Sequence, residues 1–250
     1  MLSSIGIAGT GFIAGCLIGT VGIGGVIIVP ILVYWLDVPI QIAIASAMSG
    51  YILTGIIGTL IYTRQGSINW KLAGWICLGA APGVILGSWT SSVIDPFFLK
   101  IGIGLLALSS ALSNLLRGKG IKSSQRESLP PFALCIIGVF TGLISALTGT
   151  GGPVVLVPLL TWLRLPTLVA IGLSQAVQIP VAILGTAGSL TYGNFDLILS
   201  GLLVVTLAIG TWIGARLAHI TSIANLSRLI TLVTLAVGVA ILLELYYSSV

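Results

Sequence analysis

The chain has 250 residues, of which 57% are hydrophobic and only 6% are charged, and its mean hydropathy is +1.21. These values lie outside the range of soluble globular proteins and indicate a chain that folds in lipid. The net charge of +5 would suggest nucleic-acid binding if the basic residues formed a patch on a soluble domain. They fall instead in short gaps between hydrophobic segments, so they predict membrane topology, and no nucleic-acid partner is expected.

The first half is predicted to begin with a long opening segment, at residues 5–35, that glycines interrupt. The N-terminus lacks the positive region of a secretory signal, so this segment is expected to be retained. Three ordinary spans are predicted to follow, at about 39–63, 72–93 and 97–116, because about 20 apolar residues cross a bilayer as a helix. The first repeat thus covers residues 1–116.

The stretch 117–130 is the only clearly polar linker, and it is predicted to join the halves on the cytoplasmic side. The second repeat, 131–250, opens with another glycine-broken segment at 131–163. Its three ordinary spans are predicted at about 167–191, 197–217 and 223–247. The expected fold is therefore an all-α polytopic membrane protein with about eight hydrophobic segments in two homologous halves.

A shift of 127 positions superposes the second half on the first, with one local slip that pairs Pro30 with Pro158. Matched glycine and proline positions over about 95 residues are hard to obtain by chance, so we interpret the shift as an internal duplication. The pairs include Gly11 with Gly138, Gly15 with Gly142, Gly22 with Gly149, Pro39 with Pro166, and Gly83 with Gly210.

The basic residues distinguish two topologies. If each opening segment crosses the membrane once, the ten Lys and Arg residues divide six to four between the two sides. If each segment enters and returns as two half-helices, nine of the ten share one side and only Lys100 lies on the other. Basic residues concentrate in the cytoplasm, so the second arrangement is favoured. It predicts an inverted repeat with both termini outside; a tilted, kinked crossing remains the alternative.

Each opening segment is broken by a cluster of adjacent glycines. Unwound backbone is tolerated at membrane depth only inside protein or around a wet cavity, so two such breaks indicate a site between the repeats. A half-helix that begins at a break directs free N–H groups and a positive dipole end at the site, which suits an anion. The other glycines that recur at helical spacing are predicted to allow close helix packing. These are Gly11, Gly15, Gly19, Gly83, Gly87, Gly210 and Gly214.

Hydroxyl and amide side chains near the breaks could complete an anion site. Gln175 and Gln178 share a helix face, which is a costly placement in lipid unless they face a polar cavity or bond to another helix. The predicted substrate-binding residues are Thr20, Gly22, Gly24, Gly25, Ser46, Thr148, Gly149, Thr150, Gly151, Gly152, Ser174, Gln175 and Gln178. No catalytic residue, metal ligand or cofactor is predicted, and the isolated Cys16, Cys77 and Cys135 are interpreted as structural thiols.

Several motifs occur in both halves, and together they resemble those of the sulfite exporter TauE/SafE family. They are Gly-x-Gly-Gly followed by Val-Pro (22–30, 149–158), Ala-Ile-x-x-Ser/Ala (43–47, 170–174) and a turn ending in Asn69 or Asp196. The resemblance covers nearly the whole chain and implies a bacterial inner-membrane permease for sulfite, a sulfonate such as sulfoacetate, or a related oxyanion. The first half departs from the second at Ala47, which stands where the second has Ser174.

No acidic or basic residue lies near the middle of any predicted span, so no embedded proton relay is expected. Passive or potential-driven export of a small anion is the leading hypothesis. A transporter of another organic anion, an uncharged metabolite or a cation held by carbonyl groups of the same breaks is the alternative. A membrane enzyme is disfavoured because no His, Cys and carboxylate constellation is evident. A homo-oligomer is compatible with the sequence.

Overall fold

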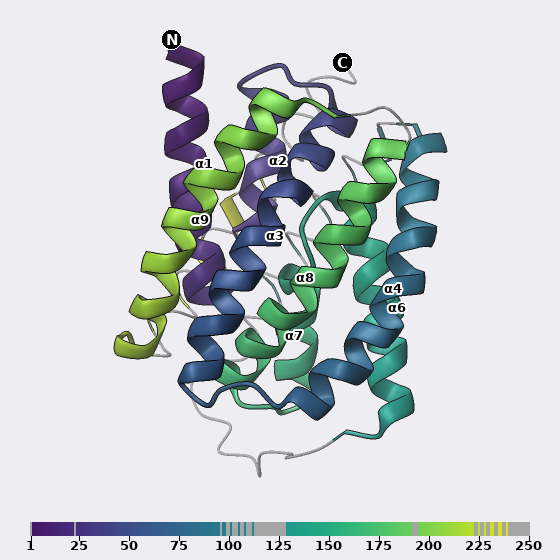
Figure 1. Ribbon diagram of the computed structural model, residues 1–250, viewed down its shortest axis with the longest axis vertical. Coiled ribbons are helices and arrows are strands. Elements are labelled where there is room, and N and C mark those ends of the chain that lie inside the picture. The colour runs from purple at the N-terminus through teal and green to yellow at the C-terminus, as the bar shows by residue number, and fades with distance from the viewer. Residues whose placement is uncertain are drawn as a thin grey trace.

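The computed structural model describes residues 2–22, 24–95, 97–98, 129–191 and 195–222, together with scattered residues in 101–112 and 225–239. These residues form eight α-helices and no strand (Figure 1). The helices are α1 (Leu2–Val21), α2 (Gly25–Tyr34), α3 (Ile40–Arg64), α4 (Trp70–Val93), α6 (Pro131–Thr148), α7 (Pro153–Trp162), α8 (Thr167–Thr191) and α9 (Leu197–Ile220). The predicted spans at 97–116 and 223–247 and most of the linker 117–130 lie outside the described residues.

Five of the described helices, α3, α4, α6, α8 and α9, are long and apolar enough to cross a membrane. The chain is therefore a multi-pass membrane protein, as its composition predicted. The spans predicted at 39–63, 72–93, 167–191 and 197–217 correspond to α3, α4, α8 and α9, with bounds that differ by at most three residues.

The opening segment of each half is a helical hairpin. In Figure 1, α1 descends from the N-terminus and α2 returns to the same end, while α6 rises from the opposite end and α7 returns to it. The arms are unequal, because α1 and α6 have 20 and 18 residues whereas α2 and α7 have 10 each. The prediction of two half-helices is thus wrong for the long arm of each hairpin. A helix of 20 residues extends about 30 Å, which is about the full thickness of the hydrocarbon core of a bilayer.

Helix bounds and helix caps recur with the 127-residue spacing. Both α8 and α9 begin and end 127 residues after α3 and α4. Asn69 caps α4 by accepting the N–H groups of the second and third residues that follow it, at 3.1 and 3.3 Å. Asp196 caps α9 in the same way, at 2.9 and 3.0 Å. An Asn or Asp side chain at this position satisfies N–H groups that the helix itself leaves free.

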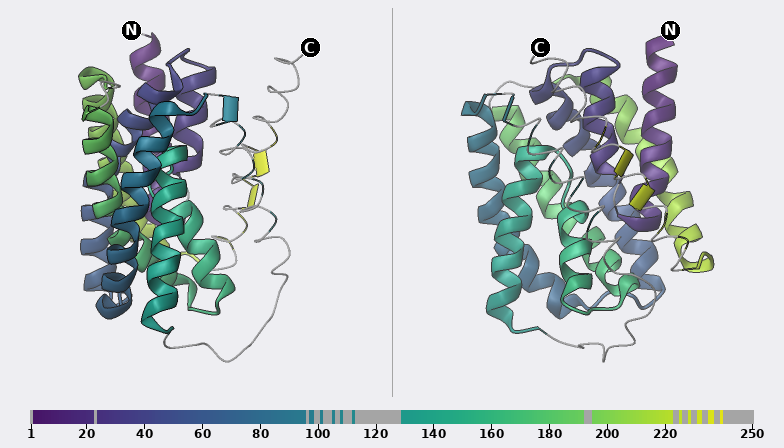
Figure 2. Two further views of the ribbon diagram at one scale, coloured as in Figure 1. Left: turned by 90° about the vertical axis from the view of Figure 1, so that its right-hand side faces the viewer. Right: turned by 180° about the vertical axis from the view of Figure 1, so that it is seen from behind.

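The long arm of each hairpin packs against the last described span of the other half. In Figures 1 and 2, α1 lies beside α9, and α6 lies beside α4. A Cβ atom added at Gly15 would meet the carbonyl of Leu207, and the equivalent change at Gly142 would meet the carbonyl of Ala80. The predicted packing role is therefore confirmed for the glycines of these faces, which approach the neighbouring helix closely at Gly11, Gly15, Gly19, Gly83, Gly87, Gly210 and Gly214.

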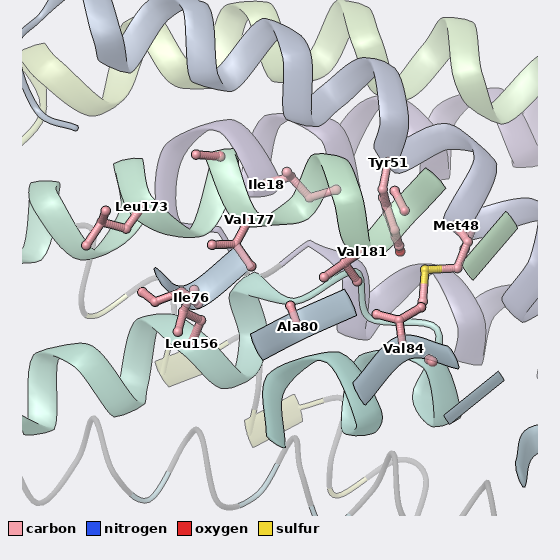
Figure 3. Close-up of a cluster of buried hydrophobic side chains, with 14 of the residues drawn as sticks. Ile18, Met48, Tyr51, Ile76, Ala80, Val84, Leu156, Leu173, Val177 and Val181 are labelled. Carbon is pink, nitrogen blue, oxygen red and sulfur yellow. The ribbon is translucent and has the colours of Figure 1, made fainter. Parts of the chain in front are cut away.

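The centre of the molecule is the contact between α3 and α8, the most buried of the long apolar helices. A hydrogen bond joins the two helices where they cross: the side-chain amide of Gln178 donates to the carbonyl oxygen of Tyr51 at 3.3 Å. These two residues are equivalent, since they stand 127 positions apart. Figure 3 shows the apolar side chains around it, with Met48 from α3, Val177 and Val181 from α8, and neighbours from α1, α4 and α7. This core holds the two breaks against α3 and α8.

Candidate functional site

The two breaks have backbone conformations that favour glycine. Gly22 and Gly149 follow the ends of α1 and α6 with positive φ of 79° and 68°, and each N–H donates to the preceding helix at 2.9 Å. Such left-handed residues are common helix terminators. Gly151 and Gly152 also have positive φ, at 76° and 110°, so the second break needs glycine at three of its four positions. It is one residue longer than the first break, which explains the slip between Pro30 and Pro158.

The fold brings the two breaks together. A Cβ atom added at Gly22 would lie 3.1 Å from Cβ of Pro153 and 3.4 Å from Oγ of Ser174. One added at Gly25 would meet the carbonyl of Thr150, in the opposite break. Residues more than 120 positions apart therefore form one region, as expected for a site between the repeats.

The short helices α2 and α7 both begin in this region without a side-chain cap. Their N-cap residues are Gly24 and Gly152, and neither accepts a hydrogen bond through a side chain. The first N–H groups of any helix have no partner within that helix, and the N-terminal end carries a partial positive charge. Pro153 occupies the first position of α7, where a missing N–H costs nothing. The arrangement can accept negative charge or the oxygen atoms of a polar ligand.

The predicted threonines bond to their own segment. The hydroxyl of Thr20 donates to the carbonyl of Cys16 at 2.8 Å, and that of Thr148 donates to the carbonyl of Ile144 at 2.7 Å. Thr148 and Thr150 also share a hydrogen bond of 3.0 Å between their hydroxyls. These residues line the breaks, but their hydroxyl protons already have acceptors within the protein.

Both predicted glutamines reach from α8 to the first half. Gln175 donates through Nε2 to the carbonyl of Ile18 at 2.7 Å, close to the end of α1. Gln178 donates through Nε2 to Oγ1 of Thr54 at 2.6 Å. The two Oε1 atoms are buried and have no hydrogen-bond partner among the described residues. The amide nitrogens therefore join the halves, and the two oxygens are available to a donor.

The two predicted serines differ in their positions. Ser174 lies beside Gly22, and its hydroxyl donates to the carbonyl of Ile171 at 2.7 Å. Ser46 is buried two residues after Ile44, which contacts Gly149, and residues two apart point to different sides of a helix. The structure therefore brings Ser174 to the breaks, whereas Ser46 is buried on α3 and its hydroxyl has no hydrogen-bond partner among the described residues.

Three residues at the breaks were not predicted from the sequence. Tyr51 packs its ring against Gly151, and its hydroxyl lies 3.5 Å from the carbonyl of Gly25. Thr141 and Ser145 are fully buried on α6 beside Gly152. Their signal is present in the sequence, because with Thr148 they form a polar stripe at helical spacing on an otherwise apolar helix. Tyr51 has no comparable signal, since a buried tyrosine on an apolar helix is ordinary core.

The polar groups inside the described part of the protein are uncharged. The buried polar residues there are serines, threonines and glutamines. The described Asp, Lys and Arg residues are all exposed. Within the same residues, no group of three or more His, Cys, Asp or Glu side chains could hold a metal ion. The site is thus built from backbone and neutral side chains.

Comparison with known proteins gives the family. The sequence profile described as sulfite exporter TauE/SafE matches residues 7–241. The chain belongs to this family. TauE/SafE proteins and their curated relatives are membrane transporters, so this chain is a transporter rather than an enzyme. The residues that carried the resemblance at the sequence level, including both glycine clusters, lie within the matched range.

The curated relatives extend over most of the chain. Probable membrane transporter protein YunE of Bacillus subtilis is 24% identical over 266 residues and covers 96% of each chain. YdhB of the same organism, also named a probable membrane transporter protein, is 26% identical over 92% of this chain and 97% of its own. The probable transporter MJ0441 of Methanocaldococcus jannaschii is 32% identical over 70% of this chain and 67% of its own. No solved structure matches the chain.

Proposed function

We propose that the chain transports a small oxyanion through the region where the two glycine breaks meet. The observation that carries this proposal is the convergence of two uncapped helix N-termini, at Gly24 and Gly152, in a region whose described polar groups are all neutral. Helix N-termini stabilise anions through free N–H groups and the helix dipole. A neutral site of this kind also releases its ligand readily, because no buried ion pair has to be broken.

Sulfite, a sulfonate such as sulfoacetate, or a related sulfur oxyanion is the proposed substrate. The description of the family names sulfite export, and the relatives are named as transporters without a substrate. Several oxygen atoms around one sulfur can accept bonds from backbone N–H groups and from hydroxyls simultaneously. The chemistry of the breaks suits that geometry, since their donors come from different helices.

We further infer that the two halves form an inverted repeat. Two pairs of helices make reciprocal contacts between the halves, α1 with α9 and α6 with α4, as expected when a twofold axis relates them. In Figure 1, α3 descends whereas its counterpart α8 ascends. With the count of basic residues, these directions favour a cytoplasmic linker and external termini in the bacterial inner membrane.

Export driven by the membrane potential needs no proton relay. The cytoplasm is negative, so moving one negative charge outward is favoured by about 2.3 kcal/mol per 100 mV. The described residues hold no buried carboxylate or histidine pair that could couple transport to protons. Potential-driven export is therefore the simplest mechanism compatible with the site.

A second candidate is a transporter of a cation or an uncharged metabolite. It is favoured by the unpartnered Oε1 atoms of Gln175 and Gln178, which can accept hydrogen bonds or contact a cation. The anion proposal assigns these oxygens to water or to a protonated form of the substrate, such as hydrogen sulfite. The two candidates differ in the ligands that should stabilise the purified protein.

Thermal shifts of the purified protein distinguish these candidates. We expect sulfite or sulfoacetate at millimolar concentration to raise the melting temperature, because a ligand that binds only the folded state stabilises it. Matched sodium and potassium chloride should leave it unchanged. Stabilisation by cations or uncharged metabolites, with none by any sulfur oxyanion, would reject the proposed substrate class.

A further inference from the structure

The starts of α2 and α7 differ in what lies behind the N-cap glycine. A Cβ atom added at Gly24 would meet the carbonyl of Ala14 and come within 2.8 Å of Cγ1 of Ile18. Packing in the first half is therefore tight and apolar. The first residue of α2, Gly25, also lies against the carbonyl of Thr150. The α2 start is thus filled by the protein itself.

The start of α7 is more open, and two hydroxyl-bearing residues, Thr141 and Ser145, lie beside it. A Cβ atom added at Gly152 would have no heavy atom nearer than 3.8 Å, the distance both to Oγ of Ser145 and to Cγ2 of Thr141. Thr141 and Ser145 stand 127 positions after Ala14 and Ile18, so they occupy the equivalent places. The duplication has therefore diverged where the helix begins, from an alanine and an isoleucine to two hydroxyls.

Those two hydroxyls are buried without a partner. Thr141 and Ser145 are both 0% exposed, and neither Oγ atom has a hydrogen bond among the described residues. Hydroxyls within helices commonly donate to the carbonyl four residues earlier, as Thr148 does on the same helix. A buried hydroxyl left without a bond costs free energy, so a pair of them at an uncapped helix start indicates a ligand.

The opposite face of α6 does not compete for these side chains. α4 packs against Cys135, Val139 and Leu143, where added Cβ atoms at its glycines would meet the α6 backbone. Thr141 lies two residues from Val139 and from Leu143, on a different side of the helix. Both side chains therefore lie beside the α7 start rather than at the α4 interface, Ser145 through its hydroxyl oxygen and Thr141 through its methyl carbon Cγ2.

We propose that one oxyanion binds per chain, at the N-terminus of α7, between the hydroxyls of Thr141 and Ser145 and the backbone N–H of Val154, since the N–H of Val155 already donates to the carbonyl of Gly152 at 3.1 Å. Pro153 has no N–H, so Val154 is the first residue of α7 that offers one. The start of α2 does not bind a second ion. This inference rests on the proposed oxyanion transport and assigns its ligands to the second half.

Binding of radiolabelled sulfite to the purified full-length protein tests this assignment. We expect one sulfite per chain, and about tenfold or greater weakening in Thr141→Val and in Ser145→Ala, since hydrogen bonds to charged groups are among the stronger ones. The variants Thr141→Ser and Ser145→Thr keep a hydroxyl and should retain binding within about threefold. They also control for folding, because loss of a methyl or its addition perturbs packing without removing the donor.

Matched controls come from buried hydroxyls elsewhere that also lack a partner. Thr186 lies on α8, 12 residues beyond Ser174 and therefore about 18 Å along the helix, and Ser200 lies on α9. Neither hydroxyl has a hydrogen-bond partner among the described residues. The control variants are Thr186→Val and Ser200→Ala. Neither variant should alter sulfite affinity. Two results would overturn the assignment and leave the proposed function intact. One is a sulfite affinity within twofold of wild type in the double variant Thr141→Val/Ser145→Ala, and the other is binding of two sulfite ions per chain. No sulfite binding by wild type would overturn both.

Discussion

Glycines in this chain serve two physical purposes. The backbone conformation and the neighbouring atoms of each glycine show which purpose it serves. At Gly149, Gly151 and Gly152 the backbone has positive φ, which favours glycine because other side chains clash there. At Gly15 and Gly83 the backbone is helical, and the missing side chain lets another helix approach. The first kind terminates helices at the site, and the second kind holds the bundle together.

Substitution of Gly83 tests the packing role. In Gly83→Ala the new methyl would meet the carbonyl of Val139 on α6, so we expect a loss of roughly 1–3 kcal/mol in stability, typical of an overpacked interface. The measurement is the melting temperature of the purified protein in detergent. Sulfite binding should persist below that temperature, since the affected interface faces away from the α7 start.

A control exists on the same helix. Gly74 has no atom within 4 Å of an added Cβ, so Gly74→Ala should leave the melting temperature unchanged or raise it slightly, because alanine favours the helix. Equal destabilisation by the two substitutions would contradict the packing role of Gly83. It would indicate a general sensitivity of α4 to alanine instead.

Part of the candidate site could be predicted at the level of single residues. The glycine clusters were evident because adjacent glycines disrupt a helical face, and Ser174, Gln175 and Gln178 because polar groups are rare in lipid-embedded helices. Which partners satisfy them was not evident, since Gln178 bonds to a residue 124 positions away. Ser46 shows the same limit, because its side of α3 is fixed only by helix packing.

At the scale of elements, the hairpins position the two glycine breaks of the candidate site. Each long arm ends at a break, and each short arm begins there with a free N-terminus, so the break lies inside the protein rather than at its surface. The sequence predicted the break but not the unequal arms. Glycine spacing indicates where a helix ends, whereas the length of each arm depends on contacts with the other half, such as those between α1 and α9.

The cap of α9 offers a test at this scale. Asp196→Ala removes the acceptor for two N–H groups and should lower stability by about 1 kcal/mol, whereas Asp196→Asn should retain most of it, because Asn69 caps α4 at the equivalent place. Thermal unfolding in detergent measures the difference. If alanine and asparagine are equally tolerated, the cap contributes nothing to the start of α9.

At the scale of the whole molecule, each half contributes a helix that packs against the other half. Each long arm packs on the other half, and α3 and α8 cross at equivalent residues, Tyr51 and Gln178. Because these contacts join the halves, we expect the two halves to unfold together. Such reciprocal contacts are compatible with the proposed inverted repeat, which rests on the basic residues and on the 127-residue spacing of the sequence.

Labelling of equivalent loop positions tests the inverted orientation. Asp37 and Arg164 are both exposed, both have positive φ, at 52° and 70°, and stand 127 residues apart. In a protein without other cysteines, Asp37→Cys should react with an impermeant thiol reagent applied outside cells. Arg164→Cys should react only after the membrane is opened, because the proposed inverted repeat would place it in the cytoplasm. Labelling of both from the same side would contradict the inversion.

The most direct test of the central claim, potential-driven transport of a sulfur oxyanion, is sulfite flux from proteoliposomes at equal internal and external pH. A potassium gradient with valinomycin sets the membrane potential. We expect sulfite to leave faster when the interior is negative and slower when it is positive, because the potential acts on the charge of the ion. Flux equal to that of protein-free liposomes, or flux that requires an imposed proton gradient, would contradict the claim.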